Sequence, residues 1–106
     1  MTKRLDVRDA ARDDLVDHYL WFAREAGVDV ADRMAAHADA ALFRLLASPG
    51  IGSPVDTYRP ELTGLRKWRV PSFPKLLIFY LVDEETLTVL RVLHAAQDWL
   101  ARLEDD

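Results

Sequence analysis

Residues 64–99 read GLRKWRVPSFPKLLIFYLVDEETLTVLRVLHAAQDW, and this stretch decides the fold. It holds three runs of β-forming residues, separated by a Pro-Ser-Phe-Pro corner and by an acidic Asp-Glu-Glu turn. The middle run is apolar on both faces, which is typical of a central strand. The pattern predicts strands over residues 65–70, 76–82 and 86–94, and a closing helix over residues 95–103.

Upstream of this stretch, the sequence predicts a short strand and two helices. Residues 3–8 alternate between charged and apolar side chains, as in a strand with one buried face. Asp9 is the expected N-cap of a helix that ends at Gly27. Asp29 is the expected N-cap of a second helix, which ends at Ser48 before Pro49.

The two helices are expected to form an antiparallel hairpin. The second helix carries four small side chains that let it approach its neighbour closely: Ala31, Ala35, Ala38 and Ala41. Residues 48–63 show neither the helix nor the strand period, so a loop is expected there. The predicted fold is α+β: a helical hairpin packed on a small antiparallel sheet, in the order β-α-α-β-β-β-α.

Length and composition limit the possible functions. The chain has 106 residues, half of them apolar, so one domain spanning 1–106 is expected. It has no cysteine, a charged start without a signal-peptide run, and no apolar run near the roughly 20 residues of a membrane span. We therefore expect a cytoplasmic protein without disulfides and not attached to a membrane.

Two further classes are disfavoured by charge and by histidine placement. A net charge of −4 argues against strong direct binding to nucleic acid through bulk electrostatics. The three histidines fall on separate predicted elements, and none has a second ligand at metal-site spacing. We expect no metal and no cofactor.

Charge is sorted along the chain. Residues 62–82 carry four cations and no carboxylate, whereas residues 9–47 carry eight acids against four arginines. In a regular strand Lys67 and Arg69 point to one side, and Arg66 and Trp68 point to the other. Two interpretations stay open: the cations contact a phosphate backbone, or they form the solvated side of a half-exposed strand, which is the simpler reading.

The end of the last strand holds a histidine and an acid four residues apart, His94 and Asp98. The carboxylate could fix the imidazole tautomer as in a general base, or the pair could fasten the last helix to the strand end, and we favour the fastening role. If the strand is regular, Arg91 and His94 point to opposite sides, which argues against joint action on one bond.

Taken in order, these segments resemble the RelE/ParE superfamily of toxins from type II toxin–antitoxin (plasmid stabilisation) systems, on its ParE side. The matching segments are Pro49-x-x-Gly52, Gly64-Leu65-Arg66, Phe73-Pro74, the apolar strand that ends at Tyr80, and Leu93-His94-Ala95-Ala96-Gln97-Asp98-Trp99. The resemblance implies an antitoxin that binds and silences the chain. It also implies one of two activities, since RelE-like members cut messenger RNA on the ribosome and ParE-like members poison DNA gyrase.

Acidity favours the ParE-like activity, a non-enzymatic one, over RNA cleavage. RelE-like enzymes are strongly basic, whereas this chain ends Glu104-Asp105-Asp106. The candidates for catalysis, should cleavage occur, are Lys67, Arg69 and His94. Leu81 and Gln97 replace arginines that many ParE-like relatives carry, so a binding module without toxicity stays open as a third reading.

Partner binding gives the remaining candidate residues. Four aromatic side chains exceed what this chain can easily bury, and an amphipathic antitoxin segment is expected to cover some of them. Phe79 is expected in the core. The antitoxin-binding candidates are Trp68, Phe73, Trp99, Arg69 and Arg91, the target-binding candidates are Arg66, Lys67, Arg69, Lys75 and Arg91, and the candidates for a structural role are His94, Asp98 and Gly64.

Overall fold

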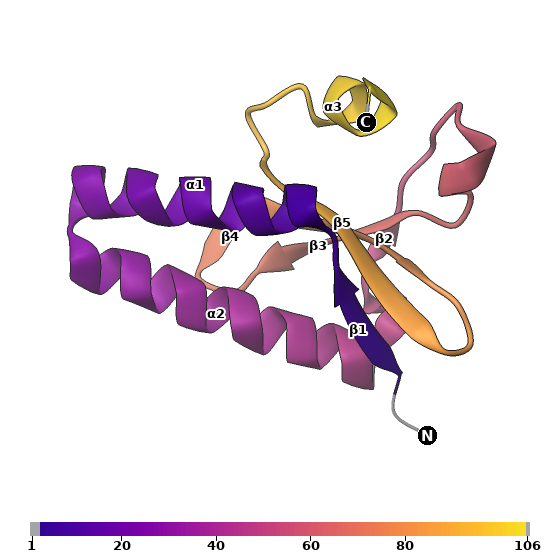
Figure 1. Ribbon diagram of the computed structural model, residues 1–106, viewed down its shortest axis with the longest axis horizontal. Coiled ribbons are helices and arrows are strands. Elements are labelled where there is room, and N and C mark those ends of the chain that lie inside the picture. Colours follow the sequence, from indigo (N-terminus) through magenta and orange to yellow (C-terminus); the bar gives the residue numbers. More distant parts are fainter. Residues whose placement is uncertain (1–2, 106) are drawn as a thin grey trace.

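A β-sheet lies between a helical hairpin on one face and a short helix with a long loop on the other (Figure 1). In a computed structural model that describes residues 3–105, the helices are α1 (Asp9–Ala26), α2 (Val28–Ala47) and α3 (Trp99–Asp105). The strands are β1 (Arg4–Val7), β2 (Ser53–Pro54), β3 (Arg66–Val70), β4 (Phe73–Val82) and β5 (Thr86–His94). Two 3-10 turns, Pro49–Ile51 and Pro60–Leu62, interrupt the loop between α2 and β3.

The predicted α+β class and order of elements are confirmed, and the sheet is mixed. Within residues 3–105 it has five strands in the order β1-β5-β4-β3-β2. Adjacent strands run antiparallel from β2 through β3 and β4 to β5, whereas β1 pairs with β5 in parallel. A parallel pair needs a long crossover connection, which the hairpin and the intervening strands supply. The two-residue strand β2 lies in the segment expected to be irregular.

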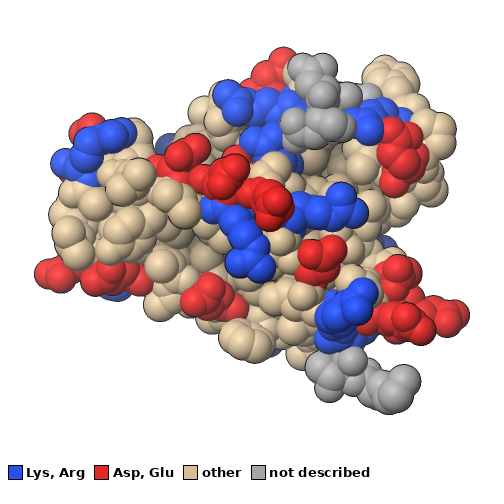
Figure 2. All heavy atoms as spheres, viewed as in Figure 1, with Lys and Arg blue, Asp and Glu red and all other residues tan. Residues whose placement is uncertain are grey.

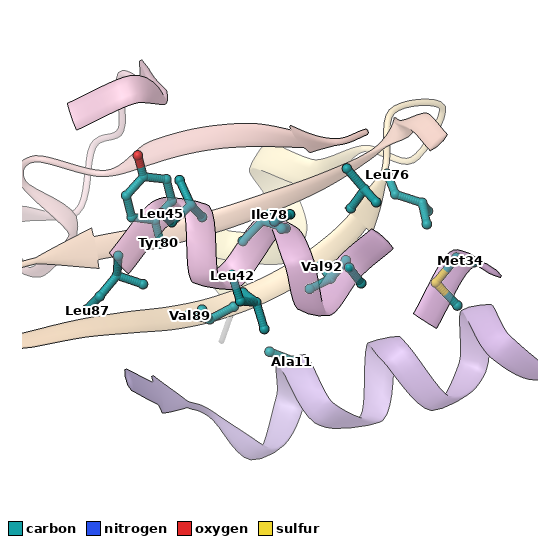
Figure 3. Close-up of a cluster of buried hydrophobic side chains, with 13 residues drawn as sticks. Ala11, Met34, Leu42, Leu45, Leu76, Ile78, Tyr80, Leu87, Val89 and Val92 are labelled. Carbon is teal, nitrogen blue, oxygen red and sulfur yellow. The ribbon is translucent and has the colours of Figure 1, made fainter. Parts of the chain in front are cut away.

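The larger core lies between the hairpin and the sheet (Figure 3). Leu42 and Leu45 of α2 pack toward Ile78, Tyr80 and Val89 of the central strands. The inner stripe of α2 is at most 2% exposed, and it consists of Met34, Ala38, Ala41 and Leu45. Burying each large apolar side chain contributes about 1.5–3 kcal/mol.

A second, smaller core covers the opposite face of the sheet. Phe79 is fully buried there, as expected, and packs with Leu65, Leu93 and Leu103. Both faces of β4 are covered, which explains why its side chains are apolar on both sides. None of the helices within residues 3–105 combines the length and the apolar character that a membrane span requires.

Gly27 alone joins the two helices. Its φ is +96°, a conformation that L side chains rarely adopt, and this lets the chain reverse within one residue. The predicted caps are therefore wrong: the N-cap of α1 is Arg8, that of α2 is Gly27, and neither makes a side-chain capping bond. Asp9 and Asp29 lie in the first turns instead, where a carboxylate interacts favourably with the helix dipole.

The strand β5 contains a bulge at Leu90. Phe79 pairs with Arg91 and Tyr80 pairs with Val89, so Leu90 has no partner across the ladder. After this extra residue the alternation changes phase, and Val92 packs on the hairpin side with Val89. The strand is therefore not regular at this point, and the period of an apolar run gives no signal of such a bulge.

Two element boundaries also differ from prediction. The strand β4 begins at Phe73, because Pro71 and Ser72 alone make the turn and Ser72 takes a positive φ of 69°. The last helix begins at Trp99 rather than at residue 95. Residues 95–98 form a turn instead, which is held by the hydrogen bond from the Gln97 N–H to the His94 carbonyl at 2.9 Å.

The Tyr80 hydroxyl fastens the loop after α2 to the sheet. It donates to the Pro49 carbonyl at 2.7 Å and accepts the Gly52 N–H at 3.0 Å. Burial raises the pKa of the Tyr80 phenol above its ordinary value. A Cβ at residue 52 would collide with that hydroxyl and lie 2.8 Å from the Lys67 carbonyl, so this close approach requires glycine.

Candidate functional site

A hollow of about 600 Å³ lies between α1 and the end of the sheet where β4 begins and β5 ends. Leu20 and Trp21 lie on its α1 side and are each 51% exposed. Figure 2 shows that this end of the hairpin presents a largely uncharged surface with charged groups at its margins. The hollow is lined by Asp17, His18, Leu20, Trp21, Phe22, Arg24, Leu76, His94, Ala96 and Gln97.

A chain of aromatic contacts holds the α1 side of the hollow in place. Trp21 packs edge-on against Phe22 with ring centroids 5.1 Å apart, and Phe22 packs edge-on against Phe73 at 5.2 Å. Phe73, predicted to bind the antitoxin, is half-buried and belongs to the packing under this surface. The sequence pattern missed Leu20 and Trp21, although both fall outside the helical stripe of Leu15, Tyr19 and Phe22.

His94 lies on the sheet side of the hollow, and the predicted contact with Asp98 is absent. Its Nδ1 accepts the Ala96 N–H at 3.0 Å, which places the ring proton of a neutral imidazole on Nε2. The His94 N–H donates to the Gln97 side chain at 2.7 Å. Asp98 is exposed, and its side chain makes no hydrogen bond or ion pair with any residue from 3 to 105. Gln97 therefore closes the turn that Asp98 was expected to fasten.

Next to the hollow, α1 caps the open edge of β5. Beyond Val89 the strand has no neighbour in β1, and side chains of the helix take over. Asp14 accepts the Val92 N–H at 2.9 Å, and the His18 ring bonds the Val92 carbonyl at 2.8 Å. Asp14 also forms a two-bond ion pair with Arg91 at 2.8 Å.

The sequence pattern missed this cap. Its one signal is an aspartate and a histidine one helical turn apart on the same face. Arg91, predicted to bind both target and antitoxin, is thus largely enclosed, since its side chain is 13% exposed.

The four cations of the basic segment have different surroundings. Arg66 donates to the Gly52 carbonyl at 2.6 Å and supports the loop. The Lys67 ammonium lies 4.8 Å from the centre of the Trp99 ring, within cation–π range. Arg69 and Lys75 are exposed, and their side chains have no hydrogen bond or ion pair with the described part of the chain. Of the four, these two present a charge that no group among residues 3–105 pairs.

The catalytic candidates do not share a face. Lys67 and Arg69 pair with Phe79 and Leu77, whose side chains belong to the core under α3. His94 pairs with Leu76, which belongs to the core under the hairpin. RNA cleavage needs a proton acceptor, a donor and cations around one phosphate, and this arrangement does not gather them.

Trp68 and Trp99 are both half-buried and lie on opposite faces of the sheet. Trp68 packs at the margin of the larger core, and its Nε1–H is buried without a hydrogen-bond partner among residues 3–105. Trp99 stacks on Phe79 with ring centroids 5.2 Å apart. Gly64 takes a φ of +89° in the turn before β3, a backbone conformation that favours glycine.

Solved structures of similar fold come from toxin–antitoxin systems. A chain from the chromosomal ParDE system of Pseudomonas aeruginosa matches with a TM-score of 0.72 and 16% identity over 88% of this chain and 96% of that one. A chain of the RelBE2 toxin–antitoxin complex from Mycobacterium tuberculosis matches at 0.59 and 25% identity over 92% and 95%. The YoeB/ParE toxin from Agrobacterium tumefaciens matches at 0.52 and 18% over 86% and 97%.

The sequence itself gives the family. Among curated proteins the chain has no match. The family model for the ParE toxin of the type II toxin–antitoxin system parDE matches residues 5–99, which include the hairpin, the residues that line the hollow, β2 to β5 and most of β1. The chain therefore belongs to the ParE toxin family of type II toxin–antitoxin systems.

Proposed function

We propose that this toxin acts by binding a protein target, DNA gyrase, and that a cognate antitoxin silences it by filling the hollow beside α1. The observation that supports the antitoxin site is the hollow itself, with two large apolar side chains half exposed on a rigid helix. Exposed apolar surface of this kind marks a binding site for another polypeptide. We propose also that residues 1–106 form one domain that works in the cytoplasm, where gyrase is found.

The occupant that fits the hollow is an amphipathic segment with acidic residues at its edge. Apolar side chains of such a segment would cover Leu20 and Trp21, and its acids would meet Arg24 in the lining. Of the antitoxin-binding candidates from the sequence, Arg69 faces the α3 side of the sheet, away from the hollow, and we assign it to the target instead. Arg91 is already paired with Asp14, and Phe73 supports the site from below.

Titrating the antitoxin encoded by the adjoining gene against hollow variants tests the site. Leu20→Ala and Trp21→Ala are each expected to weaken the complex about 10-fold or more, as for a buried interface anchor. Val16→Ala is the matched control, because Val16 is a 57% exposed apolar residue of α1 that does not line the hollow. Equal losses for Val16→Ala and Trp21→Ala would place the antitoxin elsewhere.

The target is tested with a gyrase supercoiling assay. We expect inhibition at micromolar toxin, reduced by Arg69→Glu and Lys75→Glu, since these two cations of the basic segment are exposed and unpaired among residues 3–105. Absence of inhibition would exclude gyrase. Cleavage of ribosome-programmed messenger by the free toxin would instead establish the RelE-like activity, and growth without arrest on induction of the toxin alone would indicate a non-toxic binding module.

A further inference from the structure

The outward face of α2 carries an apolar seam that nothing in the described chain covers. Phe43 is 70% exposed, and the other members of the seam are exposed alanines on the same side of the helix. In Figure 1, α2 forms one border of the molecule, with α1 and the sheet on its other sides. The α2 seam consists of Ala36, Ala40, Phe43 and Ala47, and none of the residues that line the hollow belongs to α2.

The seam has the spacing of a coiled-coil contact. Its members recur at intervals of four, three and four residues, which is the pattern that faces a neighbouring helix. A single large ring among small side chains lets two helices approach closely around it. The seam therefore fits a helix of the same kind better than a flat surface.

Two exposed charges flank the seam and determine the orientation of a helix that packs on it. Asp39 lies on one side of the stripe and Arg44 on the other, five residues later. Neither side chain has a hydrogen bond or an ion pair among residues 3–105. In two parallel helices, opposite sides of the stripes meet, so Asp39 of each copy faces Arg44 of the other. In an antiparallel pair, like sides meet, and acids would face acids.

We propose that the α2 seam is a self-association surface, through which two copies of this chain pair with their α2 helices parallel. The twofold axis runs along the helices, so Phe43 of one copy packs on Phe43 of the other between the alanines. Two Asp39–Arg44 pairs close the sides. One helix per copy is a small contact, so the dimer is weak and forms at high local concentration.

Sedimentation of the purified full-length chain over increasing concentration, up to about 0.5 mM for a weak interface, measures the pairing. We expect a monomer–dimer equilibrium that Phe43→Ala weakens about 10-fold or more. Asp39→Arg, which sets like charges opposite each other, is expected to weaken it as well, and Asp39→Arg with Arg44→Asp is expected to restore it. A chain that stays monomeric throughout would overturn the proposal.

Disulfide trapping distinguishes the parallel arrangement from others, because the natural chain has no cysteine. Ala36→Cys is expected to crosslink to itself on mild oxidation, since identical positions meet in a parallel pair. Crosslinking only in a mixture of Ala36→Cys with Ala47→Cys would indicate an antiparallel pair and contradict the proposal. Val16→Cys, also at an exposed position but on α1, is the control and should remain a monomer.

The hollow offers the alternative dimer surface, and Trp21→Ala tests it. If Trp21→Ala abolishes dimerisation while Phe43→Ala leaves it intact, the seam is not the contact. Circular dichroism of each variant confirms that these exposed substitutions leave the fold intact. Antitoxin binding is read out separately on the hollow, so either proposal can fail without the other.

Discussion

At the scale of single residues, Gly52 and Tyr80 depend on each other. Gly52→Ala brings a methyl group into the Tyr80 hydroxyl and to 2.8 Å from the Lys67 carbonyl. We expect a loss of about 1–3 kcal/mol in the free energy of unfolding, as for other overpacked sites. Urea denaturation measures it. Gly50→Ala, whose added Cβ meets nothing within 4 Å, is the control and should change stability little.

The phenol of Tyr80 also predicts how stability depends on alkaline pH. Burial raises the folded-state pKa above the ordinary value of 10.0, so the unfolded chain loses this proton first as the pH rises. The contribution of Tyr80 to stability is therefore complete below pH 10 and declines as the pH passes through the folded-state pKa. Tyr80→Phe removes this decline.

Denaturation curves between about pH 8 and pH 12, a window that brackets the tyrosine pKa, test this expectation. At neutral pH, Tyr80→Phe is expected to cost about 1–2 kcal/mol because the Pro49 carbonyl and the Gly52 N–H lose their partner. That deficit should shrink above pH 10. Tyr58→Phe is the matched control, since Tyr58 is 90% exposed, and a deficit that stayed constant with pH would contradict the role given to burial.

At the scale of elements, the attachment of α1 to β5 is the contact that the sequence did not reveal. Asp14→Ala removes both bonds of the enclosed Arg91 guanidinium to the carboxylate and leaves the Val92 N–H without its acceptor. We expect a loss of about 3 kcal/mol, since removing one member of a mostly buried ion pair is strongly destabilising. Thermal or urea unfolding measures it, with the neighbouring exposed Asp13→Ala as control. Similar effects of the two substitutions would show that the cap contributes little.

The hairpin, the central strand and the order of elements could be predicted because each has a local signature. The inner stripe of α2 has helical spacing, and residues 76–82 are apolar on both faces. Where non-local pairing decides the structure, the sequence pattern was insufficient. The bulge at Leu90, the parallel pairing of β1 and the short strand β2 all depend on neighbours far along the chain.

The candidate site was predicted less completely, for the same reason. The sequence identified basic and aromatic residues as binding candidates from their types. Which of them are available to a partner depends on their surroundings in the fold. Arg66 and Arg91 have partners within the fold, whereas Arg69 and Lys75 have none in the described part of the chain. Leu20 and Trp21 escaped attention because an apolar residue on a helix is expected in the core, and only the path of α1 over the sheet leaves them outside.

At the scale of the whole molecule, charge argues against nucleic acid as a direct ligand. The net charge is −4, and two of the four cations in the basic segment are engaged with the loop or with Trp99. We expect no binding to a duplex DNA at about 0.15 M salt by fluorescence anisotropy, since such binding relies on releasing counterions from many phosphates. Submicromolar affinity with a steep dependence on salt would contradict this.

The placement of the three tryptophans gives the protein its own optical reporters. Trp21 stands half in solvent at the hollow, and its emission should move to shorter wavelength when a ligand displaces that water. Trp99 rests on Phe79 beneath the Lys67 ammonium, so its signal follows the seating of the last helix instead. Variants that keep only Trp21 or only Trp99 would therefore report separately on ligand occupancy of the hollow and on detachment of α3, without any attached dye.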